Sequence, residues 1–242
     1  MRRAPLGPRL LRGFGGAAAT MALAGVVLAG MVLARPAGAH EHWVDLDEFR
    51  PAAGDTVRVT ARSGHYFPKK GHALAAKVVR GVTARLPDGQ VRDLAITEGD
   101  KQWEGALGPL ADGVHVFTLT LQRARAPRPR YEARAIAIAG VGSDDAAAYA
   151  VGSGLELVPR RPLTQLRPGQ SLPVALTLDG EPVAGEVTAV PTGGRTSSAK
   201  ATAQAPAVLD IRVAGRYLLS ASAGGRGCSL VFDVDEDPEV GQ

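Results

Sequence analysis

His40 and His42 are the residues whose type and position most directly suggest chemistry. If the chain is cut after Ala39, the mature protein begins His40-Glu41-His42, and its free α-amine joins two imidazoles as a possible metal ligand. In one arrangement, the amine, the next two amide nitrogens and the His42 ring surround one ion. Four nitrogens in a plane suit Ni(II) or Cu(II).

A second arrangement is also open. The amine and ring of His40 would chelate copper, and a distant histidine would complete a T-shaped brace. The other three histidines of the chain are the candidates for that position: His65, His72 and His115. Both arrangements require cleavage, because an uncleaved chain has no free amine at His40.

The segment before His40 has the features of a secretory signal peptide. Residues 1–12 carry four arginines and no acid, residues 13–34 carry no charge, and the small triplet Ala37-Gly38-Ala39 follows. A basic region, an apolar region and an A-x-A site in this order predict export and cleavage after Ala39. The alternative is an uncleaved membrane anchor, since 22 uncharged residues can span a bilayer.

Cleavage changes what the charge implies. The leader holds five of the 28 Lys and Arg residues and none of the 24 Asp and Glu residues, so the mature chain has a net charge of −1. The basic pI of the whole chain is therefore no argument for nucleic-acid binding. Cys228 is the only cysteine, which excludes an intramolecular disulfide and is typical of a buried strand residue.

The mature chain predicts an all-β fold. Short alternating runs recur every 8–12 residues with turn pairs between them, as in β-sandwiches. We expect a signal peptide over 1–39, an N-terminal β-sandwich over 40–122, a connecting region over 123–154, an immunoglobulin-like or transthyretin-like β-sandwich over 155–235 and an acidic tail over 236–242. One strand is expected within the connecting region, at 133–139.

The remaining candidates have ordinary structural interpretations beside the functional ones. His65 and His72 are expected in one loop after a strand, where functional residues are common, and His115 is expected as a hydrogen-bonded strand residue. Asp45 is expected on an exposed strand face. Trp43 and Trp103 could stack on a sugar, but two large aromatics in a chain with 5% aromatics favour core positions. Neither G-x-S-x-G nor a phosphate loop occurs, so no enzyme is predicted.

Several motifs resemble a family of secreted bacterial proteins of unknown function, formerly described as a nickel-transport subunit or a periplasmic component of cobalt or nickel uptake. The matching motifs are Ala39-His40 with Trp43, Leu155-Glu156-Leu157-Val158-Pro159, Gly169 to Leu172, and Asp179-Gly180-Glu181-Pro182. The resemblance implies export, a two-part all-β architecture and a link to transition-metal handling. His40 is the only candidate ligand within a matched motif.

Two functions from different classes follow. The first is an exported periplasmic accessory protein that binds nickel, cobalt or copper through His40, His42 and His65 and acts beside a membrane metal importer or an outer-membrane receptor. The second is a non-catalytic β-sandwich module that binds a protein or a glycan, in which the histidines are incidental.

Overall fold

The computed structural model describes residues 41–122, 130–142 and 144–236. These described residues belong to one compact unit. The predicted signal peptide and His40 lie outside the described residues, so their roles stay predictions. No membrane-crossing helix is found in the described part of the chain.

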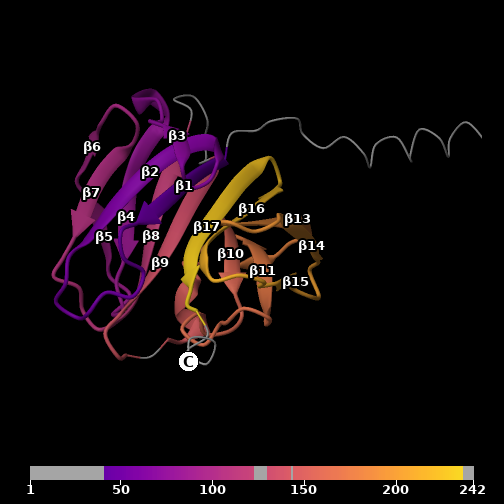
Figure 1. Ribbon diagram of the computed structural model, residues 1–242. Helices are drawn as coiled ribbons and strands as arrows, with labels where there is room; N and C mark the ends of the chain where they lie inside the picture. The colour runs from indigo at the N-terminus through magenta and orange to yellow at the C-terminus, as the bar shows by residue number, and fades with distance from the viewer. Residues whose placement is uncertain (1–40, 123–129, 143, 237–242) are drawn as a thin grey trace, which may run out of the picture. The chain divides into compact units, whose positions relative to one another are not determined.

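The strands of the described residues form three sheets (Figure 1). The first has the order β1-β2-β7-β6, with β3 also paired to β2, and consists of β1 (Glu41–Leu46), β2 (Val57–Tyr66), β3 (Lys70–His72), β6 (Ile96–Glu98) and β7 (Trp103–Leu107). The second has the order β10-β11-β12, with β15 paired to β11, and consists of β10 (Leu155–Pro159), β11 (Ser171–Leu178), β12 (Glu181–Pro182) and β15 (Ala207–Asp210).

The third sheet has eight strands and is shared by both halves of the chain. Its order is β14-β13-β16-β17-β9-β8-β4-β5, and its strands are β4 (Val79–Arg85), β5 (Val91–Leu94), β8 (Gly113–Leu121), β9 (Tyr131–Ala139), β13 (Gly185–Pro191), β14 (Ser197–Ala201), β16 (Gly215–Ala223) and β17 (Arg226–Val234). In the described part of the chain, two short 3₁₀ helices, Ala76–Val78 and Ala146–Tyr149, lie between strands.

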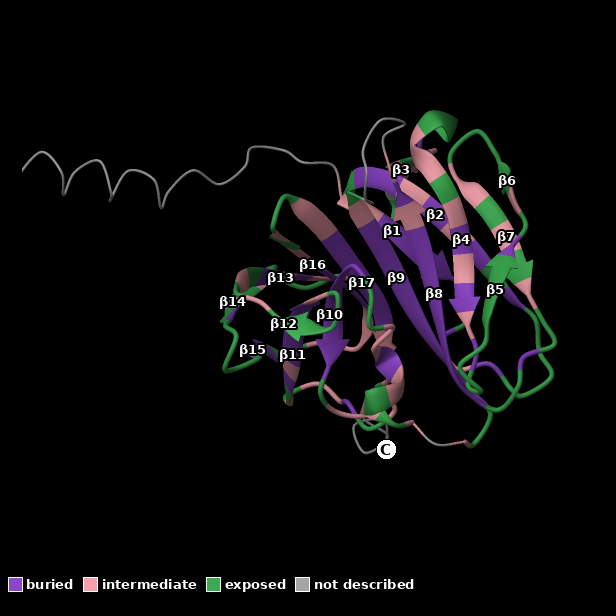
Figure 2. Ribbon diagram, turned by 180° about the vertical axis from the view of Figure 1, so that it is seen from behind, coloured by how far each residue is buried: buried purple, intermediate pink, exposed green. Residues whose placement is uncertain are grey.

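Strand β9 divides two hydrophobic cores. Its alanines, such as Ala135 and Ala137, belong to the core under the first sheet, whereas Ile136 and Ile138 belong to the core under the second sheet. Side chains of a strand alternate between faces, so one strand can serve both cores. Figure 2 shows β8, β9 and β17 as an almost continuously buried centre.

The all-β, sandwich-type fold is confirmed. The expected strand at 133–139 is found as β9, and β9 pairs in parallel with β17, with Tyr131 opposite Gly227 and Ala135 opposite Val231. This pairing joins both expected sandwiches into one sheet. The division of the chain into separate domains at residues 122 and 155 stays a prediction.

A tyrosine corner fixes the second sandwich. Tyr217, at the start of β16, accepts hydrogen bonds from the backbone N–H groups of Arg212 and Val213, both at 3.2 Å, and donates one to the Val213 carbonyl at 2.9 Å. The ring is 1% exposed and stacks on Phe232. A tyrosine that bonds back to the backbone a few residues upstream is a hallmark of immunoglobulin-like sandwiches.

The Leu155–Pro159 motif holds the connection between the two halves. The Glu156 carboxylate accepts hydrogen bonds from the backbone N–H groups of Val151 and Gly152, both at 2.9 Å, and lies 3.4 Å from the Arg134 guanidinium on β9. Glu132 lies 3.8 Å from the same guanidinium. Because all three charges are buried, this cluster gives the motif a structural role.

Candidate functional site

The first sheet places His42 and His72 on either side of one buried serine. Ser63 on β2 is opposite His42 on β1 and, across its other edge, opposite His72 on β3. Directly paired residues of antiparallel strands share a face, so these three side chains form one row. Two strand spacings place the Cα atoms of His42 and His72 about 10 Å apart.

Strand β1 is buried on both faces, which fixes the start of this row. Trp43, Val44, Asp45 and Leu46 are all at most 4% exposed. The side chains of Val44 and Leu46 belong to the core beneath the first sheet, while the side chain of Asp45 reaches Arg216 of β16. The expectation that Asp45 lies on an exposed face is therefore wrong, because β1 packs against β9 and β17 as well as pairing with β2.

Four contacts anchor the first residues of β1. The Glu41 carboxylate accepts hydrogen bonds from the hydroxyls of Tyr131 and Ser220, both at 3.2 Å. The hydroxyl of Ser229 donates to the His42 carbonyl at 2.6 Å, and the His42 ring packs edge-to-face on Tyr131 with centroids 4.7 Å apart. The chain that leaves the body toward His40 thus starts from a fixed position.

The electrostatics of this anchor keep its donor protonated. Burial raises the pKa of Tyr131 well above its usual value, and the nearby Glu41 carboxylate raises it further. Burial also raises the pKa of Glu41, although the hydrogen bonds from Ser220 and Tyr131 act in the opposite direction. The Tyr131 hydroxyl is therefore a permanent donor to Glu41 at neutral pH.

The prediction that His65 and His72 share one loop is wrong. Strand β2 continues through Tyr66, so His65 lies near its end, and His72 lies on β3 across the hairpin. Both side chains are exposed. A register shift between Ser63 and Tyr66 separates His65 from the regular alternation of the row.

His115 is excluded from this site by position. It is 1% exposed, and its Nε2 lies 2.8 Å from the Ala111 carbonyl oxygen. His115 is opposite Ala137 on β9. Ala137 is six residues along β9 from Tyr131, the residue against which the His42 ring packs. At ~3.3 Å per residue this separation is roughly 20 Å. The interpretation of His115 as a hydrogen-bonded strand residue is confirmed.

The described residues do not form a metal site by themselves. Within residues 41–122, 130–142 and 144–236, no group of three His, Cys, Asp or Glu side chains is arranged to hold an ion. Cys228 is fully buried, and burial raises its pKa to about 12. A site that includes His42, His65 or His72 therefore needs a further ligand from outside this part of the chain, and His40 is the next residue.

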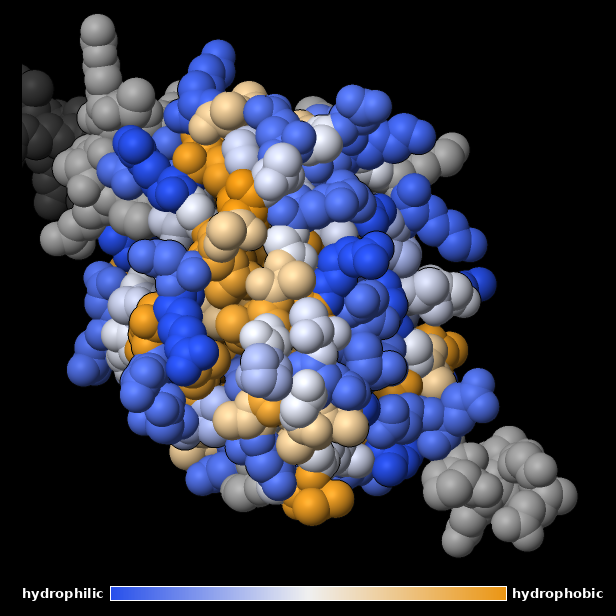
Figure 3. All heavy atoms as spheres, turned by 90° about the vertical axis from the view of Figure 1, so that its left-hand side faces the viewer, coloured by the Kyte–Doolittle hydropathy of each residue, from blue (hydrophilic) through white to orange (hydrophobic). Residues whose placement is uncertain are grey.

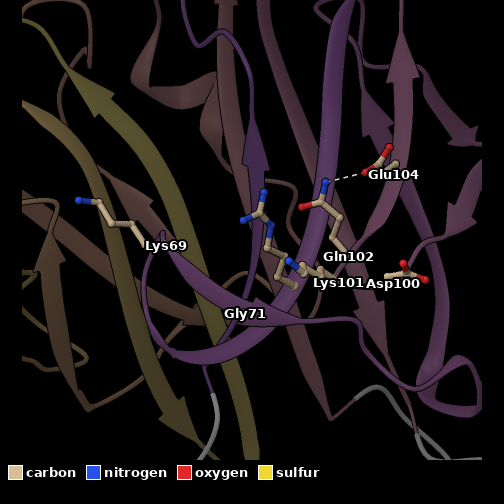
Figure 4. A pocket seen from close by; sticks show the side chains of 7 residues that line it. Lys69, Gly71, Asp100, Lys101, Gln102 and Glu104 are labelled. Atoms are coloured by element: carbon tan, nitrogen blue, oxygen red, sulfur yellow. Dashed lines mark hydrogen bonds between the residues drawn. The ribbon is translucent and has the colours of Figure 1, made fainter.

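Two hollows flank the β2–β3 hairpin, each with a volume of ≈ 320 Å³. The polar hollow is lined by Arg62, Lys69, Asp100, Lys101, Gln102 and Glu104, next to Gly71 (Figure 4). The apolar hollow is lined by Tyr66, Phe67, Pro68, Lys69, Thr192 and Gly193. Lys69 lines both, so the hollows adjoin.

Sequence reasoning missed the hairpin and the anchor of β1. Tyr66 is 68% exposed, which is unusual for a large aromatic, and its place before Phe67-Pro68 was the available signal. Tyr131 and Ser220 have no sequence signal, because their role depends on strand pairing. Trp43 is a fully buried core residue, and the Trp103 indole N–H donates to the Leu74 carbonyl at 2.8 Å, so neither is placed as a sugar platform.

The family model described as "Domain of unknown function (DUF4198)" matches residues 37–225. The chain belongs to this family. The resemblance to a family of unknown function is thereby confirmed, whereas the nickel-transport description stays a prediction. Among proteins with curated descriptions, none matches the chain.

Several solved structures are similar over most of the chain. A two-domain fibronectin type-III segment of chicken tenascin is 14% identical, covering 81% of this chain and 100% of its own, with a TM-score of 0.29. The Escherichia coli adhesin FdeC is 19% identical, with 82% and 66% coverage and a TM-score of 0.26. The Yersinia pseudotuberculosis adhesin InvE is 16% identical, with 83% and 61% coverage and a TM-score of 0.27. Scores this low carry no inference about function.

Proposed function

We propose that this DUF4198 member is an exported, non-catalytic periplasmic carrier or buffer of a divalent transition metal, nickel, cobalt or copper. The observation that supports this proposal best is the register through Ser63, which brings His72 beside His42 and the anchored start of β1. With His65 near the end of β2, three histidines lie at the end of the sheet where the mature chain would begin. Imidazole nitrogens suit all three metals.

Of the two arrangements, the geometry favours the brace. A planar four-nitrogen site needs residues 40–42 to wrap around the ion. Glu41 and His42 instead lie in the β1 ladder, and the side chain of Glu41 and the carbonyl of His42 are bound to the eight-stranded sheet. A brace leaves β1 intact: the amine and ring of His40 would bind first, and His65 or His72 would complete the site. Preorganised ligands bind more tightly than mobile ones.

In this proposal, the protein would deliver its bound metal ion to a membrane importer or an outer-membrane receptor. Since affinities rise from cobalt to nickel to copper for nitrogen ligands, metal supply and the partner would decide which ion is carried. The protein would supply no reaction step, and the ion is its cargo.

The test is metal titration of the chain exported through its own signal, after its mass has been measured. A start at His40 and one-to-one binding are expected. Binding should be lost in His72→Ala or in His65→Ala and kept in His42→Ala. The control is a two-residue N-terminal extension, which retains every histidine but moves the amine, and it should also abolish binding. A retained leader, or binding that none of these changes affects, would overturn the metal proposal.

A second candidate is a non-catalytic module that binds another protein or a glycan. Figure 3 shows an apolar band between hydrophilic flanks on the side of the molecule where β5, β6 and β7 lie. Val91 on β5, at the edge of the eight-stranded sheet, is 60% exposed. Large exposed apolar bands often mark interaction sites.

A photo-crosslinking side chain at Val91 tests this candidate in the periplasm. The matched control is position 208, where another strand valine is 55% exposed. A discrete adduct from position 91 alone would favour the module, and equal yields from both positions would remove the support.

A further inference from the structure

The β2–β3 hairpin is held rigidly enough to present a binding surface. Phe67 packs edge-to-face on the buried Trp43, with ring centroids 5.8 Å apart. Gly71 lies so close to Trp43 and Arg62 that an added Cβ would be 3.1–3.2 Å from their side chains. Arg62 also donates to the Pro68 carbonyl at 3.4 Å. The tip therefore has a defined shape although Tyr66 is exposed.

The polar hollow carries both signs of charge. Arg62, Lys69 and Lys101 contribute cations, and Asp100 and Glu104 contribute carboxylates. A strongly anionic or cationic ligand would meet like charges there. A neutral ligand with many hydroxyl groups would not, because each hydroxyl can donate to a carboxylate and accept from an ammonium or guanidinium group.

The orientation of the polar side chains suits such a ligand. Gln102 Nε2 donates to Glu104 Oε1 at 2.6 Å, which fixes an amide and a carboxylate side by side (Figure 4). Lys69 extends to the other side of Gly71 in the same view. The hydrogen-bonded pair therefore presents a donor and an acceptor next to each other, whereas the Lys69 side chain extends away from that pair in the same view.

The adjoining apolar hollow supplies a different contact. Tyr66, Phe67 and Pro68 line one side, and the Thr192-Gly193 turn after β13 lines the other. The face of an aromatic ring carries partial negative charge and attracts the C–H groups of a flat ligand. A sugar ring combines such a C–H face with outward hydroxyls, and each hollow is at the low end of the ~300–1,000 Å³ typical of small-ligand sites.

We propose that the two hollows are adjoining subsites for a neutral oligosaccharide, with one sugar ring against Tyr66 and the hydroxyls of the next in the polar hollow. This site is independent of the proposed metal site, since it uses no histidine. Trp43 supports it from the core rather than by stacking on the sugar.

The experiment measures binding of neutral trisaccharides to the exported chain in the presence of EDTA, by calorimetry and ligand-detected NMR. The probes are the trimers of β1,4-linked N-acetylglucosamine, β1,4-linked glucose and α1,4-linked glucose. At least one should bind, and Tyr66→Ala should weaken it about tenfold, the size of one lost aromatic contact. Gln102→Ala should also weaken it, and the distant Val208→Ser should not.

Three results would overturn the proposal. One is that none of the three probes binds at concentrations up to ~10 mM, because a dissociation constant above this value corresponds to very weak binding. Another is equal binding by wild type and Tyr66→Ala. The third is binding of a sialylated trisaccharide or a short peptide at the hairpin while neutral sugars fail. Because EDTA removes free metal, none of these results bears on the metal proposal.

Discussion

Arg216 Nη1 lies 3.0 and 2.9 Å from the two carboxylate oxygens of Asp45, joining β16 to β1 across 171 residues of sequence. The Asp45 side chain is 6% exposed and that of Arg216 is 33% exposed. The guanidinium also lies over the Phe49 ring, 5.4 Å from its centroid. The pair therefore links β1 of the first sheet to β16 of the eight-stranded sheet.

Arg216→Met should destabilise the protein by about 2–4 kcal/mol at pH 7, because a buried carboxylate loses its partner. Burial raises the pKa of Asp45 and Arg216 lowers it, so without Arg216 that pKa should rise further. The difference in unfolding free energy between wild type and Arg216→Met should then shrink as the pH falls and Asp45 becomes protonated. Urea unfolding at pH 7 and pH 4 measures this difference.

Arg212→Met is the control, because the ion pair of Arg212 with Asp210 is exposed on both sides and is worth ~0–1 kcal/mol. Equal losses in both variants would contradict the assignment.

Tyr217→Phe should destabilise the protein by about 1.5–3 kcal/mol, since the Arg212 and Val213 amides lose their acceptor and the Val213 carbonyl loses its donor. Thermal or urea unfolding checks the value. Tyr66→Phe removes a hydroxyl from an exposed ring and serves as control, with an expected change within ~0.5 kcal/mol. A neutral result for Tyr217→Phe would mean that the corner does not stabilise the second sandwich.

Burial lowers the pKa of His115 below 6.5, opposed by its hydrogen bond to Ala111 and by Asp88. A depressed folded-state pKa means that the unfolded chain binds the proton first. The stability contributed by His115 is thus complete above pH 6.5 and is lost as the pH falls through the folded-state value. His115→Gln keeps a donor for the Ala111 carbonyl but does not titrate. The unfolding free energy of His115→Gln should fall less between pH 7.5 and pH 5 than that of wild type, as measured by urea titration at each pH. If the unfolding free energies of the two proteins change equally with pH, the assignment is refuted.

The alternating runs and turn pairs predict most strands because each has one apolar face and ends at a turn residue. Val208 and Leu209 in β15 and the residues of β16 follow this rule. The strands that were missed include β3, β12 and β14, which are short or polar. Ser197–Ala201 has no large apolar residue and is held in the sheet by pairing with β13. Local pattern carries no information on such strands.

The shared sheet and the candidate site could not be predicted for a related reason. Tyr131 and Gly227 pair across 96 residues, and no short-range pattern specifies that parallel contact. The burial of β1 on both faces depends on it, and so does the salt bridge of Asp45. The sequence places His42 and His72 thirty residues apart, and only the register through Ser63 brings them into one row.

Cys228 should be unreactive in the folded protein. It is 0% exposed on β17, opposite Ala221 and Glu132, and burial raises its pKa to about 12, so at pH 8 almost no thiolate is present. A thiol reagent such as dithionitrobenzoate should label the native chain only through opening of the central sheet, and its rate should rise steeply near the urea midpoint. Val208→Cys in a Cys228→Ala background provides the exposed control and should react at once. Rapid labelling of the native wild-type chain would show that β17 opens locally, which would also place in doubt the rigid support that this strand gives to His42 through Ser229.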